Sequence, residues 1–392
     1  MLINIALLLG YIFLNTYAIW RIGAWIDCIF SKKKNPKKKI IAAFLFSLAS
    51  STVIVWKFLP KKTLSTFILK VGNYWLGFLI TFITILALFD ICYFALRKIK
   101  KIEKFSLNFR KAYGACILSV SLIFTIIGFV NADIIYTNSL EVTIDGKDAA
   151  TDELNVVLIA DLHMGYSIGI KKVKEVVNKI NDLNPDVVFI AGDIFDNNFD
   201  ALDNPEELTK LFRQLNAKYG VFAVYGNHDV SAELIGGFTV GGSMLRDPRM
   251  EEFLSNSNIQ VLKDSKDTIA DNSIYVIGTV DKSVSGEKIK RKTIKELLKG
   301  VDTTKPILVI SHQPEFLEEF SNYSVDAIFS GHTHGGQMFP INLTAPFVWK
   351  NSHGLLKINN MYSFVTSGVG IYGPNMRTFT KSEIMNIKIK FS

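Results

Sequence analysis

Four long apolar stretches occupy the first third of the chain, which has 392 residues in all. Each holds roughly 17–20 residues, enough to cross a ~30 Å hydrocarbon core at about 1.5 Å per residue. Because lipid offers the backbone no hydrogen-bond partners, such stretches form helices. Buried helices of a soluble core are the alternative, but four in succession would be unusual. We therefore predict a membrane domain over residues 1–131, with transmembrane helices at Leu2–Trp20, Ile40–Trp56, Gly72–Phe89 and Ala112–Val130.

The loops between these stretches differ in charge. Residues 32–39 and 97–111 carry most of the lysine and arginine of this part, whereas residues 57–70 carry less. Lysine-rich loops stay on the cytoplasmic side of a membrane, where they can also contact anionic lipid. With four spans, the amino terminus and everything after Val130 are then predicted to be extracytoplasmic. Asp90, which follows the third stretch, is predicted to lie at a helix end or to pack between helices.

The charge of the chain is divided between two parts. Residues 1–131 hold 18 Lys and Arg against 3 Asp and Glu, so the remainder is net acidic although the whole chain carries +8. A nucleic-acid-binding protein carries its basic charge on the folded domain that grips phosphates, so this class is disfavoured. All three cysteines, Cys28, Cys92 and Cys116, fall in the membrane part. A metal site in the remaining residues must therefore use His, Asp, Asn or Glu.

After a linker and first strand at residues 132–150, short strands and helices alternate. Apolar runs rich in Val and Ile suit strands that are buried on both faces, and the spacing of Val173, Val176 and Ile180 suits a helix. This alternation predicts an α/β domain over residues 151–392, in which helices cover a largely buried sheet. Strands are predicted at residues 154–160, 186–191, 221–225, 274–278, 306–310, 325–329, 362–366 and 383–391, and helices at 170–183, 205–217 and 286–299.

Side chains that can bind metals follow five of these strands, at the edge of an α/β sheet where ligands usually bind. Their mixed nitrogen and oxygen donors suit Mn, Fe or Zn better than Ca or Mg. They are too many for one tetrahedral ion, but two ions about 3.5–4 Å apart sharing a carboxylate would accommodate them, as in phosphate-ester hydrolysis. The residues are Asp161, His163, Asp193, Asp196, Asn227, His228, Asp229, His312, His332 and His334.

The order of these motifs carries a family resemblance. D-x-H, G-D-x-x-D, G-N-H-D, a single His and G-H-x-H follow one another between Asp161 and His334. This series resembles the calcineurin-like metallophosphoesterase superfamily, over about residues 150–391. The membrane-associated YkuE-like branch is similar in its later motifs too, which stand here as Gly335-Gly336-Gln337 and Gly373 to Arg377. The segment from Phe339 to His353 departs from that branch because it is more apolar.

The resemblance implies a fold, a cofactor and a set of roles. The fold would be a metallophosphoesterase-type β-sandwich flanked by helices, and the cofactor two divalent ions. A metal-bridging hydroxide would attack phosphorus in line, and His228 would protonate the leaving oxygen or stabilise the phosphoryl charge. Asp229 would orient that imidazole, and Arg377 would clamp phosphate. One ion would be held by Asp161, His163, Asp193 and His334, and the other by Asp193, Asn227, His312 and His332.

For several of these residues, a purely structural interpretation stands beside the functional one. Asp229 could be a turn or helix-cap carboxylate, Arg377 a surface residue, and Asp196 either a support for the metal ligands or a solvated side chain. The segment Ser231 to Pro248 suits a mobile lid or an ordinary long surface loop. His353, the one histidine outside the clusters, is predicted to be solvated.

Taken together, these features predict a membrane-anchored phosphohydrolase whose catalytic domain is extracytoplasmic. Its substrate would be a phosphodiester, a pyrophosphate or a phosphomonoester, possible sources being lipid-linked or envelope-derived compounds. A non-catalytic membrane sensor or binding protein that retains the fold is the alternative, but such a protein should have lost a ligand or His228, and none is missing. A transporter with an appended enzyme would place several polar residues inside the spans, where only Asp90 qualifies.

Overall fold

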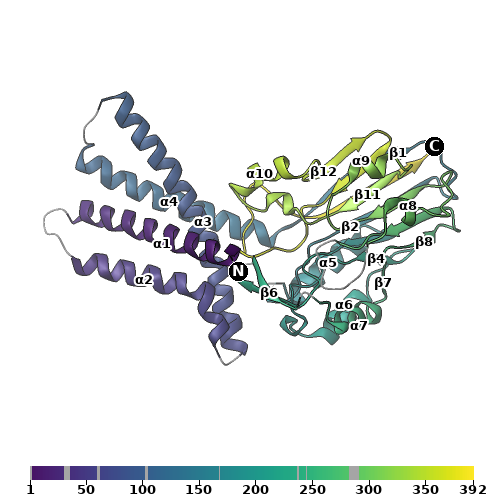
Figure 1. Cartoon of the computed structure of the whole chain (residues 1–392), viewed down its shortest axis with the longest axis horizontal. Helices are drawn as coiled ribbons and strands as arrows, with labels where there is room; N and C mark the ends of the chain where they lie inside the picture. The colour runs from purple at the N-terminus through teal and green to yellow at the C-terminus, as the bar shows by residue number, and fades with distance from the viewer. Residues whose placement is uncertain are drawn as a thin grey trace. The chain divides into compact units, whose positions relative to one another are not determined.

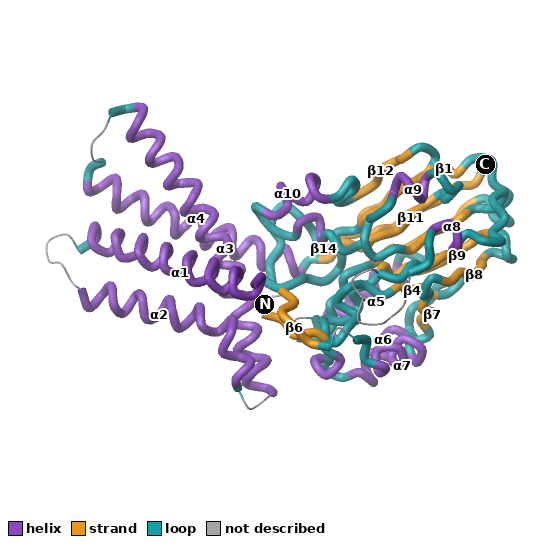
Figure 2. Tube along the Cα trace, viewed as in Figure 1, coloured by secondary structure: helices purple, strands orange, loops and turns teal. Residues whose placement is uncertain are grey.

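The computed structural model describes residues 2–30, 36–59, 62–101, 105–166, 168–235, 238–243, 245–281 and 291–392. The chain forms two compact units (Figures 1 and 2). One comprises Met1–Val130 with the short segments Ile235–Val240 and Gly373–Met376, and we call it the membrane domain. The other comprises Asn131–Leu234, Gly241–Tyr372 and Arg377–Ser392. It contains the residues that the sequence predicts to be catalytic, and for that reason we call it the catalytic domain.

The membrane domain is built from helices, as predicted. Each of the four long helices is long and apolar enough to cross a membrane. A short 3-10 helix, Trp56–Phe58, follows the second, and the third extends well beyond its apolar stretch at both ends. Lys32, Lys33 and Lys34 of the first basic loop lie outside the described residues. The helices are α1 (Leu2–Ile29), α2 (Pro36–Val55), α3 (Lys62–Ile99) and α4 (Leu107–Asp133).

Asp90 joins three of these helices through polar contacts. Its carboxylate on α3 pairs with the guanidinium of Arg21 on α1 and accepts hydrogen bonds from the hydroxyls of Tyr17 and Tyr113. An acid in an apolar bundle is stable only when it is paired in this way. The prediction that Asp90 packs between helices is confirmed.

The catalytic domain contains two six-stranded sheets whose facing side chains share one core. Val156 and Leu158 of the first sheet lie in the same buried cluster as Leu308 and Phe329 of the second. The first sheet has the order β1 (Ile135–Ile144), β14 (Ser382–Phe391), β2 (Glu153–Ile159), β3 (Val187–Ala191), β4 (Val221–Val224) and β7 (Ile259–Val261). The second has the order β12 (Gly354–Ile358), β13 (Met361–Val365), β11 (Ala327–Ser330), β10 (Ile307–Ile310), β9 (Ile274–Gly278) and β8 (Ser265–Ile269).

Helices cover the outer faces of both sheets. On the first sheet, Val173 and Val176 pack with Val157 and Val188, because apolar residues three or four apart share one helix face. The helices on that side are α5 (Ile170–Asp182), α6 (Pro205–Phe212) and α7 (Pro248–Asn256), and those on the second sheet are α8 (Ile294–Leu297) and α9 (Leu317–Ser321). The predicted α/β fold, with a sandwich flanked by helices and four apolar helices before it, is confirmed.

Some elements differ from the sequence-based prediction. The predicted basic helix at 286–299 is reduced to α8, and residues 286–290 lie outside the described part of the chain. The segment Ser231 to Pro248 holds a two-stranded hairpin of β5 (Ala232–Ile235) and β6 (Phe238–Gly242), where a lid or loop was predicted. Gly236 and Gly237 within it lie outside the described residues.

Candidate metal centre

Strand order brings the predicted metal ligands to one edge of the sandwich. β2, β3 and β4 are parallel neighbours in the first sheet, and β10 and β11 are parallel neighbours in the second, so their carboxyl ends lie together. The chain leaves these strands through left-handed backbone at several of the ligands, a conformation that clusters at functional sites. Positive φ angles occur at Asp161 (54°), His163 (47°), Asp193 (51°), His332 (70°) and His334 (50°).

Close packing of backbone against Asp193 requires a glycine after β4. A Cβ atom at Gly226 would lie 2.2 Å from Oδ1 of Asp193, a distance that no side chain can accept. The same oxygen accepts a hydrogen bond from the backbone N–H of His228 at 2.7 Å. Gly226 therefore lets the turn after β4 close over the carboxylate that follows β3.

One group of ligand atoms consists of Asp161, His163 and His334, all of them buried. The Nε2 atoms of the two histidines lie 3.1 Å apart, and Oδ1 of Asp161 lies 3.9 Å from Nε2 of His334. Asp161 is held by the backbone N–H of His332, which donates to its carboxylate at 3.0 Å. Three donor atoms from the ends of two strands, β2 and β11, thus lie close to one another.

A second group consists of Asp193, His312 and His332, with Asn227 beside them. Nε2 of His312 lies 3.0 Å from Oδ1 of Asn227 and 3.2 Å from Nδ1 of His332. Nδ1 of His312 lies 2.7 Å from the carbonyl oxygen of Ala191, to which it donates its proton. This bond directs Nε2 of His312 toward the group, which is how proteins orient metal-binding imidazoles.

Asp193 lies between the two groups. Its Oδ2 is 3.2 Å from Nε2 of His312 in the second group and 3.8 Å from Nε2 of His163 in the first. One oxygen of this carboxylate therefore lies near an imidazole nitrogen of each group.

Charges at the site are poorly balanced without a cation. Burial raises the pKa of Asp161 to about 7, and burial lowers the pKa of His163 to about 3 and that of His332 to about 4. Burial also lowers the pKa of His312, but the adjacent Asp193 carboxylate outweighs this and raises it to about 10. Divalent ions would keep the carboxylates ionised and would use the lone pairs of neutral imidazoles. The residues present therefore fit a metal centre.

His228 lies beside the ligands, with its ring centroid 4.9 Å from that of His163. The side-chain amide of Asn197 donates to its Nδ1. A neutral imidazole bound in this way carries its proton on Nε2. Sequence reasoning missed Asn197, since nothing in the G-D-x-x-D motif points to the residue that follows it.

Asp229 has contacts that differ from the expected ones. Its fully buried carboxylate accepts hydrogen bonds from the backbone N–H groups of Ile194, Phe195 and Gly226 at 2.7 to 2.9 Å. Within the described part of the chain no hydrogen bond joins it to the His228 imidazole. Asp229 holds the turns after β3 and β4 together, as in the simpler of its two interpretations, and Asn197 contacts the imidazole of His228. An influence of Asp229 on the orientation of His228 stays a prediction.

Asp196 lies near two histidines of the site, His163 and His228. Its Oδ1 lies 3.9 Å from Nδ1 of His163, which has no hydrogen-bond partner among the described residues, and it groups with His163 and His228. Burial raises the pKa of Asp196 to about 7. Of the two readings of Asp196, the structure supports the one in which it backs a metal ligand.

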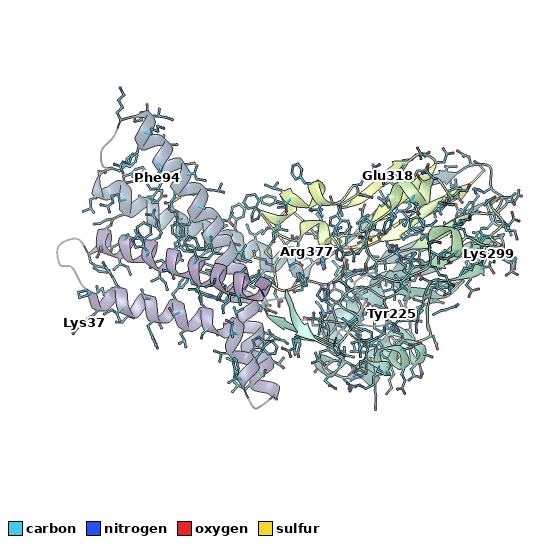
Figure 3. The ribbon with its side chains drawn as sticks, in the orientation of Figure 1. Lys37, Phe94, Tyr225, Lys299, Glu318 and Arg377 are labelled. Atoms are coloured by element: carbon cyan, nitrogen blue, oxygen red, sulfur yellow. The ribbon has the colours of Figure 1, made fainter. Side chains whose placement is uncertain are left out.

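Arg377, labelled in Figure 3, is fully buried. Its Nη2 donates to the carbonyl oxygens of Ser367 at 2.6 Å and Gly370 at 2.8 Å, and it lies 3.3 Å from Nδ1 of His334. A surface position is excluded. The contacts occupy both Nη atoms, while Nε has no hydrogen-bond partner among the described residues. Arg377 holds His334 and the 367–370 turn in place, and a role in binding phosphate stays a prediction.

Tyr372 is a further residue that sequence reasoning missed. Its ring centroid lies 5.1 Å from that of His228, 5.9 Å from that of His163 and 6.1 Å from that of His334. The side-chain amide of Gln337 holds its backbone, donating to the carbonyl at 2.8 Å and accepting from the N–H at 2.9 Å. Gln337 belongs to the G-G-Q motif, so this motif was the feature of the sequence that could have pointed to Tyr372.

Comparison with known proteins agrees with the geometry of the site. A family model described as calcineurin-like phosphoesterase matches residues 154–336. An uncharacterized metallophosphoesterase of Aquifex aeolicus is 30% identical over 243 residues, which cover 61% of this chain and 85% of that protein. The uncharacterized metallophosphoesterase YkuE of Bacillus subtilis is 28% identical over 253 residues, covering 61% of this chain and 80% of that one.

One relative also extends into the membrane part. A transmembrane protein with metallophosphoesterase domain from Danio rerio is 30% identical over 290 residues, which cover 72% of this chain. The chain spans 63% of the length of that relative. Together with the four long apolar helices, this similarity identifies a membrane protein.

Proposed function

Because the chain belongs to the calcineurin-like metallophosphoesterase family, we propose that it is a membrane-anchored phosphohydrolase that works with two divalent ions. The position of Asp193 carries the proposal. A single carboxylate oxygen lies 3.2 Å from an imidazole of one donor group and 3.8 Å from an imidazole of the other. Such a shared ligand is what two-metal hydrolysis of phosphate esters uses.

The two donor groups define which residues would hold each ion. Mn, Fe and Zn suit their mixed nitrogen and oxygen donors. When bound, the two ions would activate a water molecule and neutralise charge on the phosphoryl group. The first ion would use Asp161, His163, Asp193 and His334, and the second Asp193, Asn227, His312 and His332.

The protein's own proton donor would be His228. With Asn197 bound to Nδ1, the proton on Nε2 is available to the leaving oxygen or to a phosphoryl oxygen. Tyr372 packs against the rings of His163 and His228, so it would limit their movement and keep water away from that side. Asp196, beside His163, would keep that ligand oriented.

The substrate we propose is a phosphoester: a phosphodiester, a pyrophosphate or a phosphomonoester. The lysine-rich loops favour an extracytoplasmic catalytic domain. A domain tethered on that side meets lipid-linked and envelope-derived phosphoesters, which makes them the first candidates to test.

The test uses the full chain, purified in detergent and assayed with and without added Mn on p-nitrophenyl phosphate and its bis ester. We expect hydrolysis that depends on the metal. Asp193→Asn should lower kcat by about 100-fold or more, since it alters a ligand of both ions. The matched control is Asp182→Asn, which changes an exposed carboxylate at the end of α5 and should leave the rate unchanged.

Three outcomes decide the proposal. Equal rates in Asp193→Asn and the control would show that the hydrolysis does not come from this site. Metal binding measured by calorimetry without hydrolysis of any phosphoester would favour the non-catalytic sensor. Full activity in protein from which metal has been stripped would refute the two-ion mechanism.

A further inference from the structure

A pocket of about 300 Å³ lies inside the membrane domain, and none of the metal ligands lines it. Side chains of all four long helices line it. Small-molecule sites in proteins measure about 300–1,000 Å³, so this pocket has the size of a small site. It would take a head group and the first part of one chain of an amphiphile.

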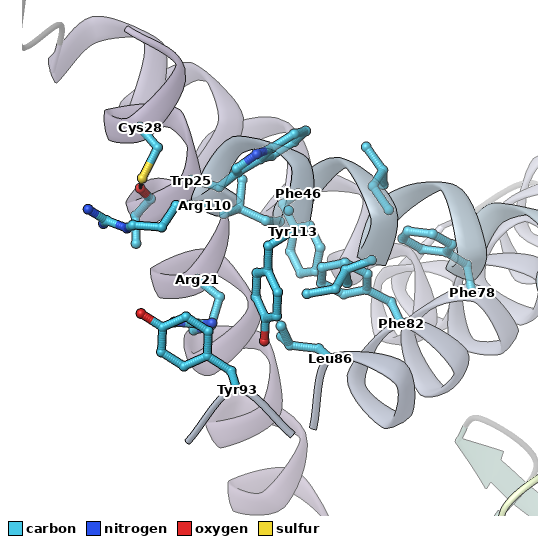
Figure 4. Close-up of a pocket in the computed structure, with 15 residues that line it drawn as sticks. Arg21, Trp25, Cys28, Phe46, Phe78, Phe82, Leu86, Tyr93, Arg110 and Tyr113 are labelled. Carbon is cyan, nitrogen blue, oxygen red and sulfur yellow. Dashed lines mark hydrogen bonds between the residues drawn. The ribbon is translucent and has the colours of Figure 1, made fainter. Parts of the chain in front are cut away.

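The lining of the pocket has two chemically different sides. Figure 4 shows Arg21, Arg110 and Tyr93 on one side, and the rings of Phe78 and Phe82 on the other. Phe78 and Phe82 are stacked, with ring centroids 5.7 Å apart. A ligand that fills this pocket therefore needs a polar, anionic end and an apolar end.

The cationic side has donors that the protein leaves unused. Arg21 pairs with Asp90, yet its Nε is buried and has no hydrogen-bond partner among the described residues. Arg110 lines the same side, and in the described part of the chain its guanidinium makes no hydrogen bond or ion pair. Because Asp90 offsets the charge of Arg21, the guanidinium of Arg110 leaves this side with a net positive charge.

Trp25 forms a wall of the pocket that is fixed in position. Its indole Nε1 donates to the carbonyl oxygen of Lys111 at 3.0 Å. The ring also packs directly on α4, where a Cβ at Gly114 would lie 2.2 Å from it. The wall is therefore held by a hydrogen bond and by close packing against a glycine.

The pocket lies at the end of the bundle that carries the basic loops. Arg21 and Trp25 belong to the last part of α1 and Arg110 to the first turn of α4, next to the lysine-rich residues 32–39 and 97–111. Basic residues at this level of a membrane protein attract anionic head groups. The catalytic domain follows the opposite end of α4 in the chain.

We propose that this pocket binds one anionic glycerophospholipid. Its phosphate lies at Arg110 and at Nε of Arg21, and the start of one acyl chain lies against Phe78 and Phe82. The site uses none of the metal ligands, so it stands independently of the proposed phosphohydrolase reaction.

Native mass spectrometry of the full chain in detergent tests this proposal, with dioleoyl phosphatidylglycerol and dioleoyl phosphatidylcholine titrated separately. The first phosphatidylglycerol should bind about tenfold more tightly than phosphatidylcholine, since a charge-assisted hydrogen bond has that effect. Arg110→Gln should remove this preference. Lys98→Gln is the matched control, because it removes an exposed charge of α3 that does not line the pocket.

Two further variants keep the test decisive. Arg110→Lys retains the charge and should retain a preference for phosphatidylglycerol, which separates loss of charge from loss of folding. Leu118→Trp should fill the pocket and weaken binding of the first lipid, with helical circular dichroism unchanged. The unmodified chain could bind both lipids equally, or Arg110→Gln could keep the preference for phosphatidylglycerol. Either result would mean that the lipid binds only to the outer surface of the helices, and it would overturn the proposal. Displacement of the lipid by millimolar inorganic phosphate would mean that the site takes a free anion, and it would overturn the lipid proposal.

Discussion

Asn197 hydrogen-bonds to Nδ1 of His228, and we expect this bond to fix the tautomer and orientation of the imidazole. This role can be tested without changing a metal ligand. Removing its amide in Asn197→Ala takes away the hydrogen bond to Nδ1, so the ring loses its fixed tautomer and orientation. We expect kcat to fall by about 10-fold to 100-fold, a part of what acid–base catalysis contributes, with little change in KM. Steady-state kinetics across pH provide the measurement.

The matched control for this prediction is Asn256→Ala, at the exposed end of α7. It should leave kcat and its pH profile unchanged. Metal content, measured by atomic absorption, should stay the same in both variants. If Asn197→Ala kept the rate and pH profile of the control, Asn197 would have no part in positioning His228.

Arg377 should matter for stability, because its guanidinium satisfies carbonyl oxygens that are otherwise buried without partners. Arg377→Met keeps most of the apolar stem but leaves the carbonyls of Ser367 and Gly370 unbonded. Each unsatisfied buried group costs about 1–3 kcal/mol, so we expect a loss of several kcal/mol in the free energy of unfolding. Denaturant unfolding of the full chain measures it, and Lys295→Met on the surface of α8 is the control. A loss no larger than in the control would contradict this account.

Sequence reasoning could predict that the candidate metal ligands lie together, because each of them follows a strand closely. Parallel strands force their carboxyl ends to one edge, so Asp161, Asp193 and His312 meet whatever the loops do. The contacts of Asn197, Asp229 and Arg377 depend instead on how the loops turn after the strands. Periodicity carries no information about such turns, so the contacts of Asp229 and Arg377 could not be predicted from the sequence.

Among the elements, the turn before β12 is tied to the first sheet by an ion pair. Nε2 of His353 lies 2.8 Å from Oε1 of Glu383 on β14, although the His353 side chain is 45% exposed. The hydrogen bond to Glu383 raises the pKa of His353 above 6.5. Burial alone would raise the pKa of Glu383, but the bond to His353 outweighs it and lowers that pKa below 4.5. His353, predicted to be solvated, is thus only partly so.

The pair gives stability a defined pH dependence. The contribution of His353 to the free energy of unfolding is fully present below pH 6.5, and it is lost as the pH rises through the raised pKa of His353. The contribution of Glu383 to the free energy of unfolding is present above pH 4.5, and it is lost as the pH falls through the lowered pKa of Glu383. His353→Gln should therefore lower the Tm of the full chain at pH 5.5 to 6 and have less effect at pH 8.5. If the loss of Tm in His353→Gln grew with rising pH, it would contradict the stabilising pair of His353 and Glu383.

At the same scale, some strands could not be predicted from their own pattern. The central strands β3 and β10, and β2 from Val156 onward, are continuous apolar runs, because both of their faces are buried. β8 and β12 lie at the edge of the second sheet and mix exposed with buried positions, so their sequences resemble loops. The hairpin of β5 and β6 was missed for a related reason, since only two strands pair there.

At the scale of the whole molecule, the distribution of charge predicts the orientation in the membrane. The acidic catalytic domain follows a membrane domain whose lysines gather in two loops that are separated by two helices. Two loops separated by two spanning helices lie on the same side of a membrane, and lysine-rich loops stay inside. The carboxyl end, which follows the fourth helix, is then outside.

Reporter fusions decide this orientation. Alkaline phosphatase fused after Ser392 should be active, and a green fluorescent protein at the same position should be dark, because the first folds only outside the cytoplasm and the second only inside. Fusing the reporters after Ile99 instead places them behind three helices, so both signals should reverse. Fluorescence at Ser392 with inactive phosphatase would place the catalytic domain in the cytoplasm. Its substrates would then have to be cytoplasmic phosphoesters, while the two-ion site and its ligands would stay as proposed.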